Sequence, residues 1–212
     1  MKITKICSHH TGPTSPTNPL SSSKDLTEGQ IENAHKDRGF NISFLGWHVG
    51  YNVIIYPDGT WKQYRLLGEQ TAASTGSNFD TFHICMAGNF TSGVDSLSLK
   101  QIETLTMIIR ALVENKPQTV GIKLAQDAVY SFSAYDIYPH RILQPNHTTC
   151  HGNALGDNLA RSIAFEYLRE KNKGNPFIYK MLSTFIDFFN KRKFGRIKVG
   201  VKDYSDDGII YK

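Results

Sequence analysis

Apolar residues recur at helical spacing in four segments of the chain, and each segment predicts a helix. Two of these helices should begin at a capping box, in which a Ser or Thr stands three positions before a Gln: Thr27 to Gln30 and Ser98 to Gln101. The four predicted helices are residues 31–38, which Gly39 ends, a segment that opens at Ser98 and places Ile102, Leu105, Ile109 and Leu112 on one face, residues 153–173, and residues 177–189.

Shorter runs rich in β-branched and aromatic residues predict strands. The turn Pro57-Asp58-Gly59 should join two of them into a hairpin. The predicted strands are Ile3 to Cys7, Gly50 to Tyr56, Thr60 to Leu67 and Phe82 to Ala87. Strands that alternate with helices around one sheet predict an α/β or α+β domain.

The composition changes this picture little. A chain of 212 residues with 40% hydrophobic and 20% charged residues is typical of one globular domain with a small appendage. No stretch approaches the roughly 20 apolar residues of a membrane span, and residues 1–7 contain no apolar core of a secretory signal. Three widely spaced cysteines fit a reducing compartment. We therefore expect synthesis in the cytoplasm without a visible signal peptide.

The charge is divided unevenly along the chain. Residues 1–170 carry 14 basic and 15 acidic residues, whereas residues 171–212 carry 10 basic and 4 acidic residues, a net charge of +6. We expect a main domain over 1–173 and a basic C-terminal extension, a helix plus a tail, over 174–212. The extension could contact an anionic wall or membrane surface, or be only a solvated end, and its helix could lie on a membrane or pack on the domain. Nucleic acid is not an expected partner, because the main domain is almost neutral.

Residues of the types that bind zinc gather in three places: residues 8–11 at the end of the first strand, residues 138–141, and residues 148–152. A catalytic zinc needs three protein ligands, such as two imidazoles and a thiolate, and a fourth position for water. Scattered His and Cys more often serve as polar or core residues, so the spacing alone leaves a metal site open.

Five segments carry a resemblance, and they occur in this order: Ile-Cys-Ser-His-His-Thr, Ala-His-Lys-Asp-Arg-Gly-Phe, Gly-Tyr-Asn-Val-Ile-Ile-Tyr-Pro-Asp-Gly-Thr, His-Ile-Cys-Met-Ala-Gly-Asn-Phe, and His-Arg followed by Thr-Thr-Cys-His-Gly. Together they resemble the zinc-dependent N-acetylmuramoyl-L-alanine amidase family, which includes phage endolysins and peptidoglycan recognition proteins. The resemblance runs from about Ile3 to Leu168. It implies a single central mixed β-sheet flanked by helices.

The resemblance also implies an activity, hydrolysis by zinc-activated water of the amide between the lactyl group of N-acetylmuramic acid and L-alanine. It implies Zn²⁺ as cofactor and assigns the site residues as follows: His9, His140 and Cys150 as metal ligands, Tyr51 and Thr148 as catalytic residues, and Asn78 and Arg65 as substrate-binding residues. His10 competes with His9, because neighbouring strand residues point to opposite faces and only one of them can reach the metal.

The chain departs from the family pattern at several positions. Cys85 stands where one branch of the family has a catalytic Glu, so the chain should resemble the branch that uses a tyrosine. Asn52 replaces a histidine after that tyrosine, and His151 replaces a proline after the cysteine. Residues 72–74 lack a histidine that is common in relatives. Three further histidines, His35, His83 and His147, are expected to be structural or exposed.

Two other functions compete with an amidase. A recognition module would bind muropeptide without cutting it, but such relatives have generally lost the cysteine ligand, which this chain keeps as Cys150. An unrelated structural or regulatory protein is the second alternative. As an enzyme, the chain is expected to be a monomer that acts on peptidoglycan of the cell wall, most simply as a lysin released through a holin; recycling of muropeptides, or secretion with a signal that has been removed, stay open.

Overall fold

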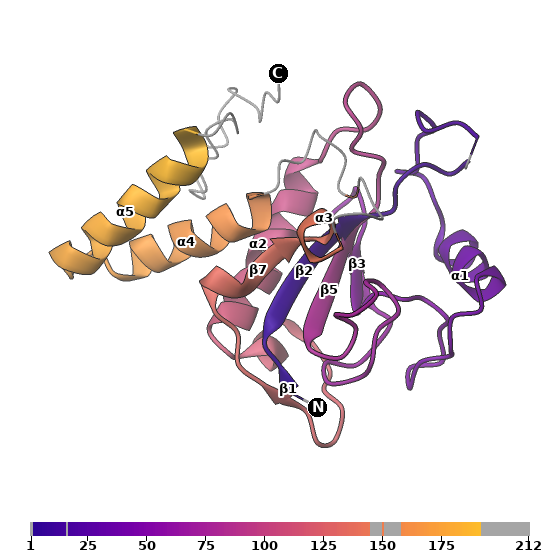
Figure 1. The fold of residues 1–212 in the computed structure, drawn as a ribbon, viewed down its shortest axis with the longest axis horizontal. Helices are drawn as coiled ribbons and strands as arrows, with labels where there is room; N and C mark the ends of the chain where they lie inside the picture. The colour runs from indigo at the N-terminus through magenta and orange to yellow at the C-terminus, as the bar shows by residue number, and fades with distance from the viewer. Residues whose placement is uncertain (1, 16, 145–149, 151–157, 192–212) are drawn as a thin grey trace.

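A computed structural model of the chain describes residues 2–15, 17–144, 150 and 158–191, without the side chains of residues 185 and 188–191. Its centre is a five-stranded sheet in the order β4-β3-β5-β2-β7 (Figure 1). The strands are β2 (Lys5–His10), β3 (Val53–Ile55), β4 (Trp61–Gln63), β5 (Thr81–Met86) and β7 (Ile137–Pro139). β4 is antiparallel to β3, and the other neighbours are parallel. The sheet is therefore mixed, as predicted. A separate parallel pair joins β1 (Lys2–Ile3) to β6 (Val129–Tyr130).

The parallel strands place the ends of distant segments at one edge of the sheet. β2 pairs with β5 from Lys5 to His10, and it pairs with β7 on its other side. Because parallel strands end at the same edge, the residue that follows β7, His140, lies close to the histidines that end β2. Figure 1 shows the short helix α3 (His140–Leu143) at this end of β2, opposite β1.

The helices begin where the sequence predicts. Thr27 caps α1 (Glu28–Asp37) and Ser98 caps α2 (Leu99–Val113), and each cap forms the complete capping box with its Gln. The later helices are α4 (Leu159–Lys171) and α5 (Pro176–Lys191), with single 3₁₀ turns at Pro117–Val120 (η1) and Ala134–Asp136 (η2). The predicted start of α4 at 153 lies outside the described residues. None of the helices within the described ranges has the length and hydropathy that a membrane crossing requires.

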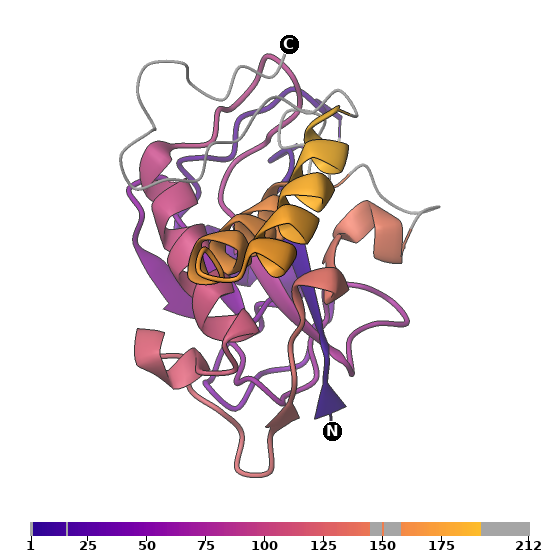
Figure 2. The same ribbon diagram turned by 90° about the vertical axis from the view of Figure 1, so that its left-hand side faces the viewer.

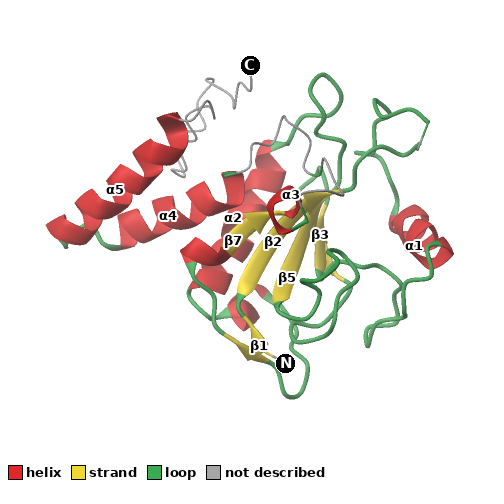
Figure 3. Ribbon diagram, viewed as in Figure 1, coloured by secondary structure: helices red, strands yellow, loops and turns green. Residues whose placement is uncertain are grey.

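The two faces of the sheet differ in chemistry. On one face, Ile6 and Ile84 pack with apolar side chains of α2 and α4, such as Leu105 and Ile163, into the main core. Figures 2 and 3 show these helices together on one side of the sheet. The alternate residues of β2 and β5 face the other way; they are Cys7, His9, His83 and Cys85, and all four are fully buried. We call these four residues the polar face; toward β3 the same side of the sheet continues into a second apolar cluster that includes Ile54 and Cys85 itself.

Three predicted strands differ from the structure in length or continuity. The hairpin strands span three residues each, because the regular pairing ends beside Val53: the Asn52 carbonyl accepts from the N–H groups of both Tyr64 (2.8 Å) and Arg65 (3.3 Å), and the Gly50 carbonyl accepts from the Ala72 N–H (3.0 Å). The first strand is interrupted after Ile3, where the N–H groups of Thr4 and Lys5 both donate to the Asp80 carbonyl.

The apolar stripe of α5 packs on the domain. Leu182 and Ile186 are buried in the main core, Ile178 packs against it, and α5 lies along α4 (Figure 1). Packing, and not a membrane surface, is therefore the role of these three side chains; those of Phe185 and Phe189 are outside the description. The domain boundary at 173/174 stays a prediction.

Candidate metal centre

Three predicted ligands converge at the edge of the sheet. The Cys150 Sγ atom lies 3.9 Å from His9 Nδ1, and the ring centroids of His9 and His140 are 4.4 Å apart. One ligand atom from each of the three side chains lies within 4.8 Å of the others. His9 ends β2, His140 begins α3, and Cys150 comes from a later segment, so the sheet topology brings together residues that are up to 141 positions apart.

His10 takes a different role from its neighbour. Its ring lies on the side of Phe90, whose backbone N–H donates to His10 Nδ1 at 3.1 Å. The His10 backbone N–H in turn donates to Cys150 Sγ at 3.4 Å. A hydrogen bond to sulfur favours the thiolate form that binds metals. The alternation of side chains along β2 therefore selects His9, and not His10, as the ring that faces Cys150 and His140.

Both candidate ligand histidines form a hydrogen bond through their Nε2 atom. His9 Nε2 lies 2.8 Å from His83 Nδ1, and His140 Nε2 lies 3.1 Å from the Gln144 amide oxygen. The Gln144 oxygen also accepts from the Thr75 N–H at 3.2 Å. Such contacts fix the orientation of a ligand ring and the nitrogen that it offers to a metal.

The donor set fits zinc. Two imidazoles and one thiolate are a catalytic zinc set that leaves one position open. With ordinary bond lengths, ligand atoms on a tetrahedral zinc are separated by about 3.3–3.6 Å. The 3.9 Å between Cys150 Sγ and His9 Nδ1 is close to that spacing. Small side-chain movements would bring the ligand atoms of His9, His140 and Cys150 to tetrahedral spacing.

A second group, Cys7, His9 and His83, also satisfies the distance limit for a metal site. Its two nitrogens are only 2.8 Å apart, however, which is a hydrogen-bond distance and is shorter than about 3.3 Å between two nitrogens on one tetrahedral zinc. We therefore interpret His9 and His83 as a hydrogen-bonded pair, with the ligand set on the other side of the His9 ring.

Burial favours the neutral form of four side chains in this region: His83, His140, Cys7 and Cys85. It lowers the pKa of His140, and burial together with the nearby His140 lowers the pKa of His83 to about 3. Burial also raises the pKa of the Cys7 and Cys85 thiols. A neutral imidazole is the form that binds a metal or accepts a hydrogen bond.

Tyr51 lies beside the candidate ligands. Its ring centroid is 5.1 Å from that of His9 and 5.4 Å from that of His35. Burial, and then the nearby Cys85, raise the pKa of the phenol well above its usual value, so the hydroxyl stays protonated. Cys85, which replaces the family's Glu, stands opposite His9 on β5. The site therefore has a protonated hydroxyl at Tyr51 and no carboxylate at Cys85. This is consistent with the prediction that the chain resembles the branch that uses a tyrosine.

The predicted substrate-binding residues hold loops of the protein. Arg65 is buried, and its guanidinium donates to the carbonyls of Val49 (2.7 Å), Gln70 (3.1 Å) and Asn41 (2.5 Å) and to Glu69 (3.4 Å). The Asn78 side-chain oxygen accepts from the N–H groups of Ala73 (2.9 Å) and Ser74 (2.8 Å). Their contacts with substrate stay predictions.

The structure also locates the other departures and histidines. His35 is buried and its Nδ1 accepts from the Gly50 N–H at 3.2 Å, while the Asn52 side-chain oxygen accepts from the His83 N–H at 2.8 Å. Both are structural contacts. Thr148, the predicted oxyanion donor, lies outside the described residues, as do His147 and His151.

Sequence reasoning missed the contacts of His83 and Gln144. It placed His83 among structural or exposed residues and gave Gln144 no role. No local pattern marks the His83 contact, since it depends on the register between β2 and β5. For Gln144, the spacing of four residues from His140 on a helical turn was an available signal.

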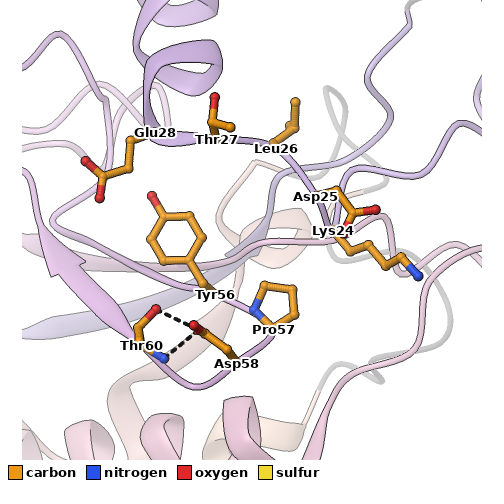
Figure 4. Close-up of a pocket in the computed structure, with 9 residues that line it drawn as sticks. All are labelled: Lys24, Asp25, Leu26, Thr27, Glu28, Tyr56, Pro57, Asp58 and Thr60. Atoms are coloured by element: carbon orange, nitrogen blue, oxygen red, sulfur yellow. Dashed lines mark hydrogen bonds between the residues drawn. The ribbon is translucent and has the colours of Figure 1, made fainter.

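A surface pocket elsewhere is not this centre. It is formed around Tyr56, with the N-terminus of α1 on one side and the hairpin turn on the other (Figure 4). There the Asp58 carboxylate accepts from the Thr60 N–H and hydroxyl, at 2.9 and 2.6 Å. None of the predicted site residues lines it.

With this geometry in place, comparisons with known proteins define the class. The model of the N-acetylmuramoyl-L-alanine amidase family matches residues 1–153. The match covers most of the chain, and the chain belongs to this family. The peptidoglycan amidase class follows from that membership. A comparison with curated protein sequences gave no match.

Similar solved structures include endolysins and a peptidoglycan recognition protein. An endolysin N-acetylmuramoyl-L-alanine amidase, LysCS from Clostridium intestinale, is 22% identical over 72% of this chain and 76% of its own, with a TM-score of 0.50. The Ph2119 endolysin from a Thermus scotoductus bacteriophage is 22% identical over 72% and 79%, with a TM-score of 0.47. Drosophila peptidoglycan recognition protein SA is 19% identical over 72% and 74%, with a TM-score of 0.48.

Proposed function

We propose that this chain is a zinc-dependent amidase that hydrolyses the bond between the lactyl group of N-acetylmuramic acid and L-alanine in peptidoglycan. The observation that carries the proposal is the convergence of His9, His140 and Cys150 within 4.8 Å in a member of the amidase family. These three residues would hold the metal. Bound zinc would supply polarisation of the scissile carbonyl and activation of a water molecule.

The residues around the ligands then have distinct tasks. The protonated hydroxyl of Tyr51, whose ring packs beside His9, would orient the attacking water or move its proton. Thr148 would donate to the oxyanion that develops on the lactyl oxygen. Asn78 and Arg65 would position the muropeptide, directly or through the loops that they hold. Collapse of the tetrahedral species would break the C–N bond, and the proton given up by the attacking water would pass to the nitrogen of L-alanine as it leaves.

We further propose that the protein acts as a lysin on the cell wall. Support comes from the charge of residues 171–212, a net +6 against an almost neutral main domain. Such a segment favours an anionic surface such as a wall or membrane. A recycling enzyme would gain nothing from this charge, because its substrate is a small soluble muropeptide.

The decisive experiment combines metal analysis with product analysis. Purified protein should contain about one zinc per chain. It should clear a suspension of cell walls and release new L-alanine amino termini without new reducing sugar ends. A chelator should abolish clearing, and added zinc should restore it.

A recognition module gives the opposite result. Members of the peptidoglycan recognition group share this fold, so binding of walls without new amino termini would identify the chain as a binding protein. Zinc-free protein with full activity would refute the metal part of the proposal alone.

A further inference from the structure

His83 belongs to neither the ligand set nor the apolar core, yet it is fully buried beside the proposed metal centre. It lies on β5, one strand from His9, and its Nδ1 atom is 2.8 Å from His9 Nε2. A fully buried imidazole that carries one proton and contacts a ligand ring at this distance must either donate to that ring or accept from it.

Counting protons distinguishes these two arrangements. The 2.8 Å contact holds a single proton between the two nitrogens. If His83 donated it, His9 Nε2 would be an acceptor, and the proton of the neutral His9 ring would sit on Nδ1. A protonated Nδ1 cannot bind a metal. If His83 accepts, His9 carries its proton on Nε2, and its Nδ1 lone pair points toward Cys150, 3.9 Å away.

We propose that His83 is a positioning residue, which accepts the Nε2 proton of His9 and thereby holds His9 in the tautomer that presents Nδ1 to zinc. The inference rests on the proposed function, since it assumes the metal centre at His9, His140 and Cys150. Gln144 stands in the same relation to His140, whose Nε2 atom lies 3.1 Å from the Gln144 amide oxygen. The amide oxygen can only accept, so both histidines are driven toward the same tautomer.

The arrangement places the proton of His83 on its own Nε2. Among the described residues, that buried atom has no hydrogen-bond partner within the usual limits of distance and angle. A buried N–H without a partner destabilises the fold. Keeping His83 at this position is therefore easier to explain by a task at the metal centre than by stability, because an ordered acceptor orients a ligand imidazole and raises its basicity.

The first test needs no variant. Long-range ¹⁵N–¹H correlation spectra of zinc-loaded wild-type protein report which nitrogen of each imidazole carries the proton. We expect Nε2–H on both His9 and His83. A proton on His83 Nδ1, or signals that show His83 itself bound to zinc, would overturn the proposal.

The second test measures zinc affinity by competition with a chromophoric chelator. His83→Leu removes the acceptor, and we expect zinc affinity to fall by about 10- to 100-fold. His83→Gln offers an amide oxygen in place of the imidazole nitrogen and should recover most of that loss. Rescue by Gln separates positioning from packing, because both replacements disturb the packing of the ring.

Cobalt substitution and a thiol control complete the design. The visible spectrum of the Co²⁺ protein reports the ligand set, and it should stay unchanged in His83→Gln. Cys7→Ala is the matched control: Cys7 shares the polar face and the rival group with His83, but it is outside the proposed ligand set. Its zinc affinity should equal that of the wild type.

The outcomes separate this inference from the proposed function. Wild-type protein that binds no zinc would refute the proposed metal centre. Wild-type protein that binds zinc, together with a His83→Leu variant of equal affinity, would refute only the role of His83. Loss of zinc in both Cys7→Ala and His83→Leu would refute it as well and would identify the rival group as the metal site.

Discussion

The two faces of the central sheet are built from the same strands, but one contributes apolar burial and the other carries the proposed metal site. On the apolar face, Ile6 and Ile84 meet α2 and α4, and their contribution is removal of hydrocarbon from water. On the polar face, the intervening residues Cys7, His9 and His83 are just as buried, but burial of polar groups costs free energy unless they find partners.

This difference shows how one short strand can serve both stability and chemistry. The apolar face tolerates little change in volume, and the polar face tolerates little change in hydrogen bonding. A low-polarity surrounding makes the few polar contacts there strong and keeps the rings in fixed positions. Substitutions on the two faces should therefore have separable effects.

The largest expected effect comes from Cys150→Ala. Loss of the thiolate removes one of three proposed ligands, so cleavage of cell walls should become undetectable, while far-UV circular dichroism and wall binding stay close to wild type. Elemental analysis measures the bound zinc, and clearing of walls measures cleavage. Cys85→Ala removes a buried thiol of the polar face that is outside the proposed ligand set; it is the control and should keep its zinc. Full activity of the Cys150 variant would remove this residue from the centre.

Ile84→Ala tests the apolar face. The side chain is fully buried between β5 and the helices, so its truncation should lower the free energy of unfolding by about 2–5 kcal/mol. Turnover per folded molecule in saturating zinc should be unchanged. Chemical denaturation measures the free energy of unfolding, and wall clearing measures turnover. Met107→Ala, at an exposed position on α2, is the matched control. A large loss of turnover in the folded Ile84 variant would show that the faces are coupled.

Tyr51→Phe separates the hydroxyl from the ring. The ring keeps its packing against His9 and His35, so stability should change by less than about 1 kcal/mol. Activity should fall by about 10²-fold if the hydroxyl takes part in proton transfer. Zinc content should not change, because Tyr51 is not a proposed ligand. Wild-type turnover in the Phe variant would reduce Tyr51 to a packing residue.

The sequence predicts the apolar face better than the polar face, for a physical reason. Periodic apolar residues and capping boxes are local signals, and they located α1, α2 and the strand β5 to within a few residues. The contact of His83 with His9 depends instead on which residues of two distant strands stand opposite each other. The resemblance supplied His9, His140 and Cys150 as a set, but it gave no indication of what holds their rings.

Arg65 shows the same limit from another direction. The resemblance assigned it to substrate, although Arg65 lies outside the five segments that carry the resemblance. Its carbonyl partners are Val49, Gln70 and Asn41. They lie in different loops, and no local sequence pattern predicts that these loops come together. A site residue can thus be located by pattern while its contacts depend on the tertiary structure.

The smallest expected effect concerns the basic C-terminal extension, and the structure divides it into two parts. Leu182 and Ile186 of α5 are core residues, so truncation after Gly174 should expose apolar surface, lower the melting temperature and reduce activity on every substrate. Truncation after Lys191 keeps α5. It removes residues 192–212, which carry six basic and three acidic residues, a net charge of +3.

Only the shorter truncation isolates the charge. We expect it to lower activity on intact walls by about tenfold at low salt, the lower end of electrostatic steering, and to leave cleavage of a small soluble muropeptide unchanged. The loss on walls should shrink as salt rises, because the attraction is screened over about 8–10 Å at physiological ionic strength. Rates on intact walls and on the soluble muropeptide, measured across a salt series, show whether the charge is responsible. Equal losses on both, with a lowered melting temperature, would show that residues 192–212 brace the fold as α5 does, and the proposed targeting by charge would be wrong.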